Sequence, residues 1–254
     1  MSGRRAKLKG TLWLVLVCIV AVGISANFSM FARLVPFSTE KKIAAAIPFG
    51  ARASPCNRGA GARALNKLVA RLYPIEPGDA EFQIAVTAVH NPEVNAYAAL
   101  GGQVFVNQGL IEQAESPEEL AGVLAHEIEH VRRRHVLENV IVRLGTYGAL
   151  KLIFSDAPST ADMAQMVLGL QYGKAQEHEA DQGGLERLAK AEVDARGFMS
   201  FFERMQQRAP DKMDFLSDHP SDASRAELAA HYIGRNSRPV LSGAEWKELK
   251  NVCR

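Results

Sequence analysis

The chain has 254 residues, of which 47% are hydrophobic and 23% are charged, a composition typical of a globular protein with one sizeable core or a core and an anchor. Its formal net charge of +2 depends on four basic residues at the start; without these four, 26 of the 30 basic residues remain against 28 acidic ones. The rest of the sequence therefore has no excess of positive charge, and it has no stripe of Lys and Arg interleaved with aromatic residues. Nucleic acid is excluded as an expected partner.

An apolar segment follows these basic residues directly. From Gly10 to Ala32 there are 23 residues without a charge, which as a helix would span about 35 Å, enough to cross a bilayer. The basic flank predicts that the start stays in the cytoplasm and the rest is exported. Residues 1–35 are interpreted as a basic stub with a transmembrane anchor, or alternatively as a signal peptide cleaved after Ala26. Residues 36–60, rich in Pro and Gly, are interpreted as a linker and domain entry.

Two cysteines lie in the part of the chain expected to be exported. Cys18 falls within the apolar segment, which leaves Cys56 and Cys253. In an oxidising compartment two thiols favour one bond. We therefore predict a disulfide between Cys56 and Cys253, with two free thiols as the alternative.

The folded part, residues 61–254, is expected to begin with an amphipathic helix and a small sheet. In "GARALNKLVARLYP" four apolar residues share one helical face, and the helix is expected to stop at Pro74. Three short segments rich in β-branched and aromatic residues follow, "EFQIAVTAV", "NAYAAL" and "GQVFVNQG", separated by turn residues. We expect them to form a small antiparallel sheet.

A helix start is marked by Ser116 as the N-cap, Pro117 at the first helical position and Glu119 three residues after the cap. This helix has an apolar stripe that we expect to be buried: Leu120, Leu124, Ile128 and Val131. Further helices are predicted over 139–154, 161–191, "GFMSFFERMQQ" and 221–233. Because helices dominate and one small sheet precedes them, the predicted fold class is α+β, mostly helical.

The stretch "LAHEIEHVRRRH" lies inside that capped helix. Residues four apart on a helix share one face, so His126 and His130 can offer both imidazoles to one ion while Glu127 projects beside them. Zinc binds imidazole well, and a glutamate beside it can take a proton from the water that attacks a peptide carbonyl. The plain alternative is a solvated, charged helical face.

A catalytic zinc site needs a third protein ligand. One branch of these enzymes takes it from a histidine six residues after the second, with a glycine midway, but Val136 and Arg133 occupy those positions here. The later stretch "KAQEHEADQGG" offers Glu177 as a ligand and Asp181 as an acceptor that orients a ligand histidine. Three neighbouring candidates are interpreted as non-ligands that point elsewhere or pack: His135, His178 and Glu179.

Three motifs in order carry a family resemblance. The run "NPEVNAYAALGGQVFVNQGLIEQAESPEELAGVLAHEIEHVRRRH", then "EHEAD", then "HPSDASR" resembles the HtpX, BepA and Oma-type zinc metallopeptidases, the group that includes the CAAX prenyl proteases, over roughly residues 60–232. The resemblance implies a zincin-like (gluzincin) fold with one Zn²⁺ per chain. It implies His126, His130 and Glu177 as metal ligands, Glu127 as the general base, and Asp181 in a supporting role.

The resemblance also implies residues around the cleft. An edge strand above it would pair with an extended substrate, and we assign to it Asn95, Ala96, Gly101 and Gly102; a hairpin turn is a compatible interpretation of the two glycines. His219 is implied as a fourth ligand at rest or as an oxyanion stabiliser, with a loop histidine as the alternative. Arg225 is expected to be structural or to donate a hydrogen bond toward the site.

The resemblance implies a zinc metalloendopeptidase that hydrolyses misfolded or damaged envelope proteins. It is expected in a bacterial inner membrane with a single crossing and a catalytic domain in the periplasm, or free in the periplasm after signal cleavage. A zinc-stabilised periplasmic chaperone or assembly factor is the alternative function, and a mitochondrial inner membrane is a minor alternative location. Since HtpX and the prenyl proteases have several membrane crossings, this chain is more similar to small exported members. The sequence gives no oligomeric state.

Overall fold

The computed structural model describes the following residues: 32–47, 54–56, 58–74, 82–143, 170–208, 219, 224–233 and 237–254. Of the segment expected to hold the anchor, residues 1–35, only 32–35 lie within these ranges, and most of the helix expected over 139–154 lies outside them. Within the described ranges, no helix is both long enough and apolar enough to cross a bilayer.

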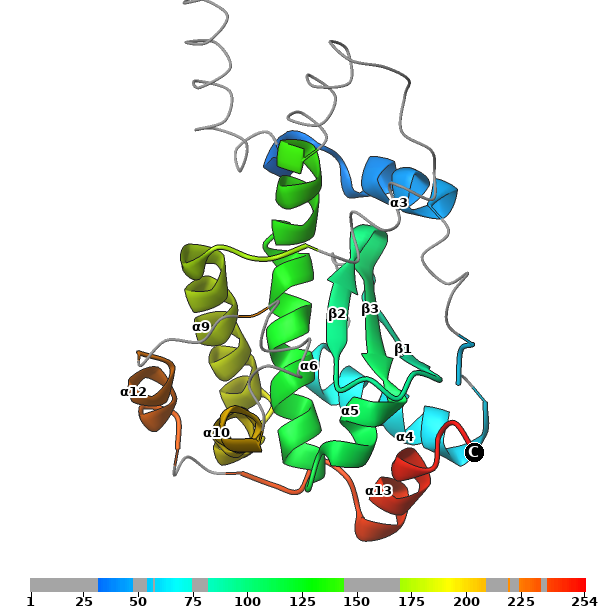
Figure 1. The fold of residues 1–254 in the computed structure, drawn as a ribbon, viewed down its shortest axis with the longest axis vertical. Coiled ribbons are helices and arrows are strands. Elements are labelled where there is room, and N and C mark those ends of the chain that lie inside the picture. The colour runs from blue at the N-terminus through cyan, green and yellow to red at the C-terminus, as the bar shows by residue number, and fades with distance from the viewer. Residues whose placement is uncertain are drawn as a thin grey trace, which may run out of the picture.

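Helix α6 (Pro117–Arg132) occupies the centre of the fold, with the sheet on one side and α9 (Lys174–Lys190) and α10 (Arg196–Arg208) on the other (Figure 1). Its predicted start is confirmed, because the Ser116 hydroxyl accepts a hydrogen bond of 3.2 Å from the Glu119 amide, with Pro117 at the first helical position. The expected apolar stripe is buried, and so are all the remaining residues from Glu119 to Val131. A helix covered on both sides has no polar face, which explains why charged motif residues are buried here.

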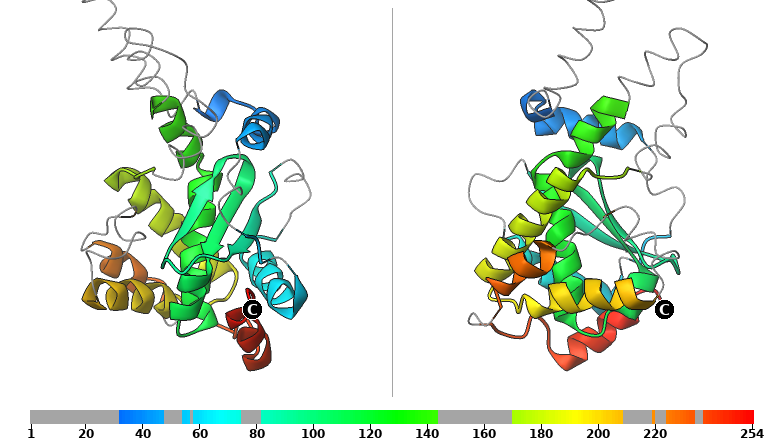
Figure 2. Two further views of the ribbon diagram at one scale, coloured as in Figure 1. Left: turned by 45° about the vertical axis from the view of Figure 1, so that its right-hand side comes forward. Right: turned by 60° about the vertical axis from the view of Figure 1, so that its left-hand side comes forward.

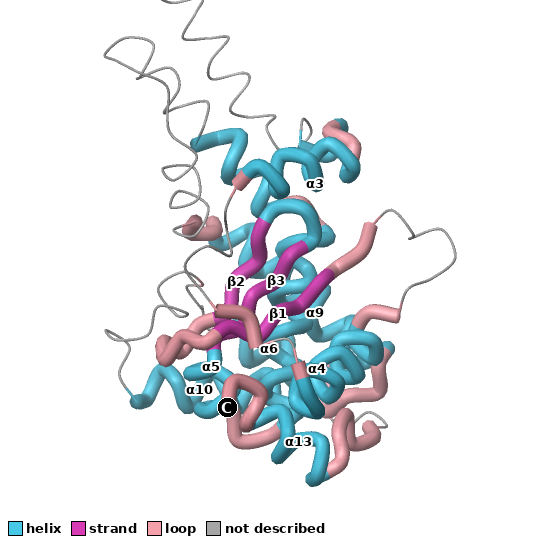
Figure 3. Tube along the Cα trace, turned by 90° about the vertical axis from the view of Figure 1, so that its right-hand side faces the viewer, coloured by secondary structure: helices cyan, strands magenta, loops and turns pink. Residues whose placement is uncertain are grey.

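The sheet has three strands, β1 (Ala85–Val89), β2 (Ala96–Ala99) and β3 (Gln103–Asn107), in the order β1-β3-β2 (Figure 3). The strands lie where the sequence predicted them, but the purely antiparallel pairing was wrong. Strand β2 pairs with β3 in an antiparallel hairpin, whereas β1 pairs with β3 in parallel. The reason is topological: the chain leaves β1, reverses and forms the far edge first, so the returning β3 lies between the two and runs in the direction of β1.

The turn between β2 and β3 is a short 3-10 element, Leu100–Gly102. Gly101 and Gly102 have φ values of +74° and +84°, in the left-handed region that favours glycine. The hairpin-turn interpretation of these glycines is therefore confirmed, and they are not part of the edge strand itself. Ala96 begins that strand and Asn95 directly precedes it.

Helix α3 (Phe37–Ala46) forms within the range expected to be a linker and packs on this turn. A Cβ atom on Gly101 would lie only 2.7 Å from the Cβ of Ala44. The linker prediction thus differs from the structure over these ten residues. Their sequence gave no clear helical pattern because the helix buries just three side chains, Phe37, Glu40 and Ala44.

Helix α4 (Gly59–Leu72) buries Leu65, Leu68 and Leu72 on its predicted face. It packs against α13 (Gly243–Lys250), a C-terminal helix that the sequence analysis missed. The structure contains the predicted disulfide: Cys56 and Cys253 are bonded across 197 residues, with their Cα atoms 4.9 Å apart. The C-terminal helix is thereby tied to the entry of the domain.

Helix α9 runs alongside α6 in the opposite direction, and both views in Figure 2 keep the two helices side by side. It begins at Lys174, so the helix predicted over 161–191 was wrong for residues 170–173, which are not helical; residues 161–169 lie outside the described ranges. Two further helices follow expected patterns, α10 and α12 (Ser224–Ala230), and α5 (Gln108–Gln113) was not predicted. Helix α10 supplies three buried aromatic side chains, Phe198, Phe201 and Phe202. The rings of Phe198 and Phe202 lie 6.4 and 6.2 Å from that of His126, and Phe201 packs on Phe202.

Candidate metal centre

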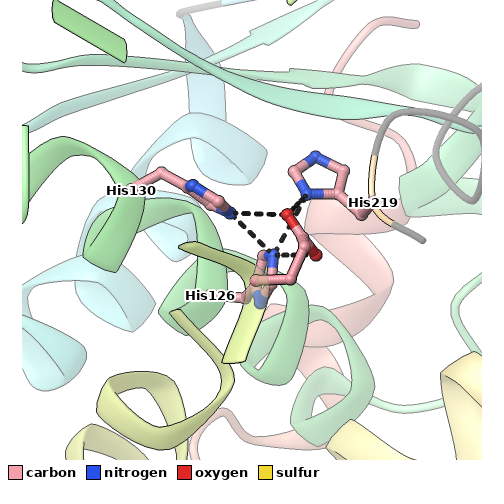
Figure 4. Close-up of side chains that lie close together, drawn as sticks. His126, His130 and His219 are labelled. Atoms are coloured by element: carbon pink, nitrogen blue, oxygen red, sulfur yellow. Dashed lines mark hydrogen bonds and ion pairs between the residues drawn. The ribbon is translucent and has the colours of Figure 1, made fainter. Parts of the chain in front are cut away.

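Four buried side chains converge on one point beside α6. His126 and His130 come from α6, Glu177 comes from α9, and His219 lies far along the chain, before α12. Each offers one potential ligand atom, and these four atoms all lie within 4.8 Å of one another. None of the four residues is more than 3% exposed. Figure 4 shows the three imidazole rings turned toward a shared centre.

The distances match the edges of a small coordination polyhedron. The Nε2 atom of His126 lies 3.0 Å from Nε2 of His130 and 3.1 Å from Nδ1 of His219. The Glu177 Oε1 atom lies 3.3 Å from Nε2 of His130 and 3.0 Å from Nδ1 of His219. In a tetrahedral zinc site with bonds of about 2.0–2.1 Å, ligand atoms are roughly 3.3 Å apart. The four side chains therefore fit a single small divalent cation.

The close approach of α9 to α6 brings the carboxylate to the imidazole pair. Gly184 lies opposite His126, and a Cβ atom there would be 3.2 Å from the His126 amide nitrogen. Gly183 lies against Glu129, where a Cβ would be 2.4 Å from a carboxylate oxygen. Because neither glycine has a side chain, the two helices cross closely enough for Glu177, two turns earlier, to reach the histidines.

The electrostatics of the cluster suit metal binding. Burial holds the pKa of His130 well below its usual value, so its imidazole is neutral and keeps a lone pair. Burial alone would raise the pKa of Glu177, but the imidazoles of His126, His130 and His219 outweigh it and the pKa is lowered. A neutral imidazole, as at His130, and an ionised carboxylate, as at Glu177, are donor forms that a divalent cation requires.

A second ring of contacts surrounds the ligand atoms. The Asp181 Oδ1 atom lies 2.9 Å from Nδ1 of His126, within reach for the predicted orienting role, although the two atoms do not have full hydrogen-bond geometry. The other Asp181 oxygen accepts a hydrogen bond of 2.6 Å from Nε of Arg225. Arg225 in turn donates to Oε2 of Glu177 at 3.3 Å. One guanidinium from α12 thus links the carboxylate at the cluster to the carboxylate behind it.

Two further residues contact the ligand His130. His135, interpreted from the sequence as a packing or surface histidine, is buried outside the group of four, with its Nδ1 atom 3.1 Å from Nδ1 of His130 and its Nε2 atom 3.5 Å from the Glu179 carboxylate. Burial lowers the pKa of His135 to about 4, so the ring is neutral and its Nδ1 atom can accept a hydrogen bond from Nδ1 of His130. Tyr172 packs on the other side, with its ring centre 3.8 Å from that of His130. Glu179, as expected, points away from the cluster.

Glu127 is fully buried beside the cluster. Among the described residues, neither of its carboxylate oxygens has a partner with full hydrogen-bond geometry. Its Oε1 atom lies 3.4 Å from Nε2 of His219, and the backbone amide of Ala98 on β2 also faces it. Burial raises the pKa of Glu127, which the nearby histidines only partly offset. A buried carboxylate with open acceptor positions is suited to hold and deprotonate a water molecule.

Comparison with known proteins agrees with this geometry. Residues 62–233 match the model of peptidase family M48. The chain is 34% identical over 149 residues to the mitochondrial metalloendopeptidase OMA1 of Arabidopsis thaliana, covering 57% of this chain and 30% of that protein. It is 36% identical over 131 residues to the putative beta-barrel assembly-enhancing protease of Vibrio cholerae, covering 46% and 27%, respectively.

The beta-barrel assembly-enhancing protease of Escherichia coli (strain K12) is 27% identical over 174 residues, covering 62% of this chain and 36% of that protein. The matches thus span about a third of the length of these relatives. The family match covers most of the chain and includes both metal-site helices and His219. The chain therefore belongs to peptidase family M48.

Proposed function

We propose that the chain is a zinc-dependent endopeptidase that hydrolyses peptide bonds in proteins. The observation that carries this proposal is the convergence of His126, His130 and Glu177 within bonding reach of one cation, with the Glu127 carboxylate buried beside them. The nitrogen and oxygen donor set favours zinc, which prefers imidazole and carboxylate ligands. Relatives named as metalloendopeptidases and proteases support the same reaction class.

In the proposed reaction Glu127 handles the proton. A zinc ion in this site would polarise the peptide carbonyl and lower the pKa of a water molecule. Glu127 takes the proton from the attacking water and returns it to the amine of the leaving segment, so no net proton is consumed. The raised pKa of Glu127 brings the carboxyl closer to the working pH, where one group can serve as base and then as acid.

The edge of β2 is the proposed place for the substrate backbone. The Asn107 amide donates to the Asn95 carbonyl at 3.0 Å, which makes this pair a hydrogen-bonded one. Hydrogen-bonded and non-bonded pairs alternate in an antiparallel ladder, so the backbone groups of Ala96 and Ala98 point away from β3. An extended segment can pair with them, and the Ala98 amide faces Glu127. We therefore add Ala98 to Asn95 and Ala96 as residues proposed to bind the substrate backbone. The turn glycines instead shape the end of the strand.

We assign His219 the role of a fourth ligand at rest. Its Nδ1 atom lies within the cluster, 3.1 Å from Nε2 of His126. A catalytic site needs one open coordination place, so His219 would have to leave the cluster before substrate binds. Its Nε2 atom already lies near Glu127, which keeps the ring close enough to stabilise charge on the substrate oxygen after that movement.

For the biological setting we propose quality control of envelope proteins at the periplasmic face of a bacterial inner membrane, with the N-terminal segment as the membrane attachment. Relatives named beta-barrel assembly-enhancing protease support a bacterial envelope role, while the relative named as mitochondrial keeps the alternative location open. A zinc-stabilised chaperone is less well supported because Glu127 has the burial and position that hydrolysis requires.

Metal analysis combined with cleavage of an unfolded protein tests the proposal. The purified full chain in detergent is expected to hold one zinc per chain and to cut a reduced and alkylated protein substrate. A chelator should abolish cleavage, and added zinc should restore it. His126→Ala is expected to lose both metal and cleavage. Cleavage that persists in the metal-free protein would contradict the proposal.

A further inference from the structure

A buried glutamate outside the metal centre links three separate parts of the fold. Glu40 belongs to α3, which precedes the region that matches the family, and only 3% of its surface is exposed. Its Oε1 atom accepts a hydrogen bond of 2.8 Å from the Gly101 amide. Its Oε2 atom lies 2.7 Å from Nη2 of Arg134. Both oxygens of one carboxylate thus contact elements that come much later in the chain.

The first of these elements is the turn that directly follows the edge strand β2. Apolar contacts reinforce the polar one: a Cβ atom on Gly101 would lie 2.7 Å from Ala44, and one on Gly102 would lie 3.0 Å from the Phe37 ring. Helix α3 therefore rests on the turn at van der Waals distance. A turn held in this way cannot shift along or away from the sheet without breaking the contact with Glu40.

The second element is the end of the metal-site helix. Arg134 follows α6 by two residues and has a φ value of +65°, a backbone conformation that is uncommon for a residue other than glycine. Its Nη2 atom donates to the Val35 carbonyl at 3.0 Å while facing the Glu40 carboxylate. Since Arg134 lies four residues after His130, the same carboxylate is connected both to the turn after β2 and to the segment that follows the metal-site helix.

We propose that Glu40 is a positioning residue that fixes the edge strand β2 relative to Glu127, through Gly101 on one side and Arg134 on the other. The inference rests on the proposed function, in which the substrate backbone pairs with β2. Ala98, whose amide faces Glu127, lies three residues before Gly101. A loosened turn would let this amide and the paired substrate move relative to the carboxylate. A displacement of about 1 Å can cost on the order of 100-fold in rate.

The test uses Glu40→Ala, Glu40→Gln and a matched control. Glu119 is the control because it is also 3% exposed and its carboxylate also contacts a backbone amide, that of Glu115 at 2.8 Å, and an arginine, Arg204 at 2.5 Å. It accepts one additional hydrogen bond, from the Ser200 hydroxyl. The zinc-loaded full-length proteins are compared by hydrogen–deuterium exchange over residues 96–102, and by kcat and KM for an unfolded protein substrate. Metal content is measured on the same samples.

Glu40→Ala is expected to keep one zinc per chain, to speed amide exchange over residues 96–102 at least tenfold, and to lower kcat/KM by roughly 10- to 100-fold. Glu40→Gln keeps an acceptor for the Gly101 amide, so its exchange should lie between those of Glu40→Ala and the wild type. Glu119→Gln is expected to leave exchange over 96–102 and kcat/KM unchanged.

Unchanged exchange over 96–102 in both Glu40 variants would overturn the proposal, and so would an equal effect of Glu119→Gln. Faster exchange with unchanged kcat/KM would also refute the positioning role, because loosening the turn would then have no effect on the reaction of the substrate. Exchange does not depend on activity, so a wild type that fails to cleave would refute the proposed function while the contact between α3 and the turn is still tested.

Discussion

Asp181→Asn isolates the contact behind the metal ligand His126. The substitution keeps the shape of the side chain and removes its charge. In the structure Asp181 is 5% exposed, and its carboxylate lies 2.9 Å from Nδ1 of His126 and accepts a hydrogen bond of 2.6 Å from Arg225. An asparagine can present only one oxygen, so it cannot serve the imidazole and the guanidinium together. We expect weaker metal binding together with a less stable metal-free fold.

The magnitudes follow from these contacts. Loss of such a supporting partner typically weakens metal affinity roughly 10- to 100-fold, which corresponds to about 1.4–2.7 kcal/mol. Removing one partner of a buried ion pair costs about 3–5 kcal/mol when the other charge is left unpaired. Arg225 keeps its contact with Glu177 and lies 4.1 Å from the centre of the Phe202 ring, so we expect a smaller loss of about 2 kcal/mol in the metal-free protein.

Competition with a chelator of known zinc affinity measures the first effect, and urea unfolding of the metal-free protein measures the second. Asp194→Asn is the matched control, since Asp194 also pairs with an arginine, Arg196, but lies on the surface away from the cluster. It should leave zinc affinity unchanged. A zinc affinity for Asp181→Asn within twofold of the wild type would show that Asp181 does not orient His126.

Three further predictions concern stability. Reduction of the bond between Cys56 and Cys253 should lower the free energy of unfolding by about 5 kcal/mol in the chain-entropy model; matching urea midpoints for oxidised and reduced protein would argue against this. Burial raises the pKa of Glu119, but its paired arginine and a backbone amide outweigh burial and hold the pKa below 4.5. Its contribution is therefore present above pH 4.5 and lost as the pH falls through the lowered pKa, so Glu119→Gln should flatten the fall of the urea midpoint between pH 5 and pH 3; an unchanged slope would count against it. Gly122→Ala should destabilise by about 1–2 kcal/mol although alanine favours helix, because its Cβ would lie 2.7 Å from the Phe198 backbone; a stabilised variant in thermal unfolding would contradict this.

Helix capping and helical spacing were sufficient to predict the central helix α6 and the shared face of its two histidines. The cap at Ser116 and the spacing of His126 and His130 each depend on helix geometry alone, so sequence predicted both the start of α6 and the shared face of the two imidazoles. Glu177 and Asp181 followed from the same rule on α9. The convergence of the two helices did not follow from spacing; it came from the family resemblance, and the structure shows that Gly184 permits it.

Features that depend on tertiary packing could not be predicted in this way. His135 approaches His130 after a break in the helix at Arg134, where the four-residue rule no longer applies. The parallel pairing of β1 depends on which strand occupies the edge, which short-range patterns do not specify. Helix α3 has too few buried apolar residues to be visible as an amphipathic pattern. By contrast, the last helix carried a readable signal that was missed, a capping box between Ser242 and Glu245.

Glu127→Gln in the zinc-loaded, full-length protein tests most directly whether Glu127 is the general base of a zinc-dependent hydrolysis. Glutamine preserves the size of the buried side chain but cannot take the proton, and it is not one of the four cluster residues. We expect a zinc content equal to that of the wild type and a loss of cleavage of an unfolded protein of roughly 100-fold or more. Full zinc content with wild-type cleavage would show that Glu127 is not the general base.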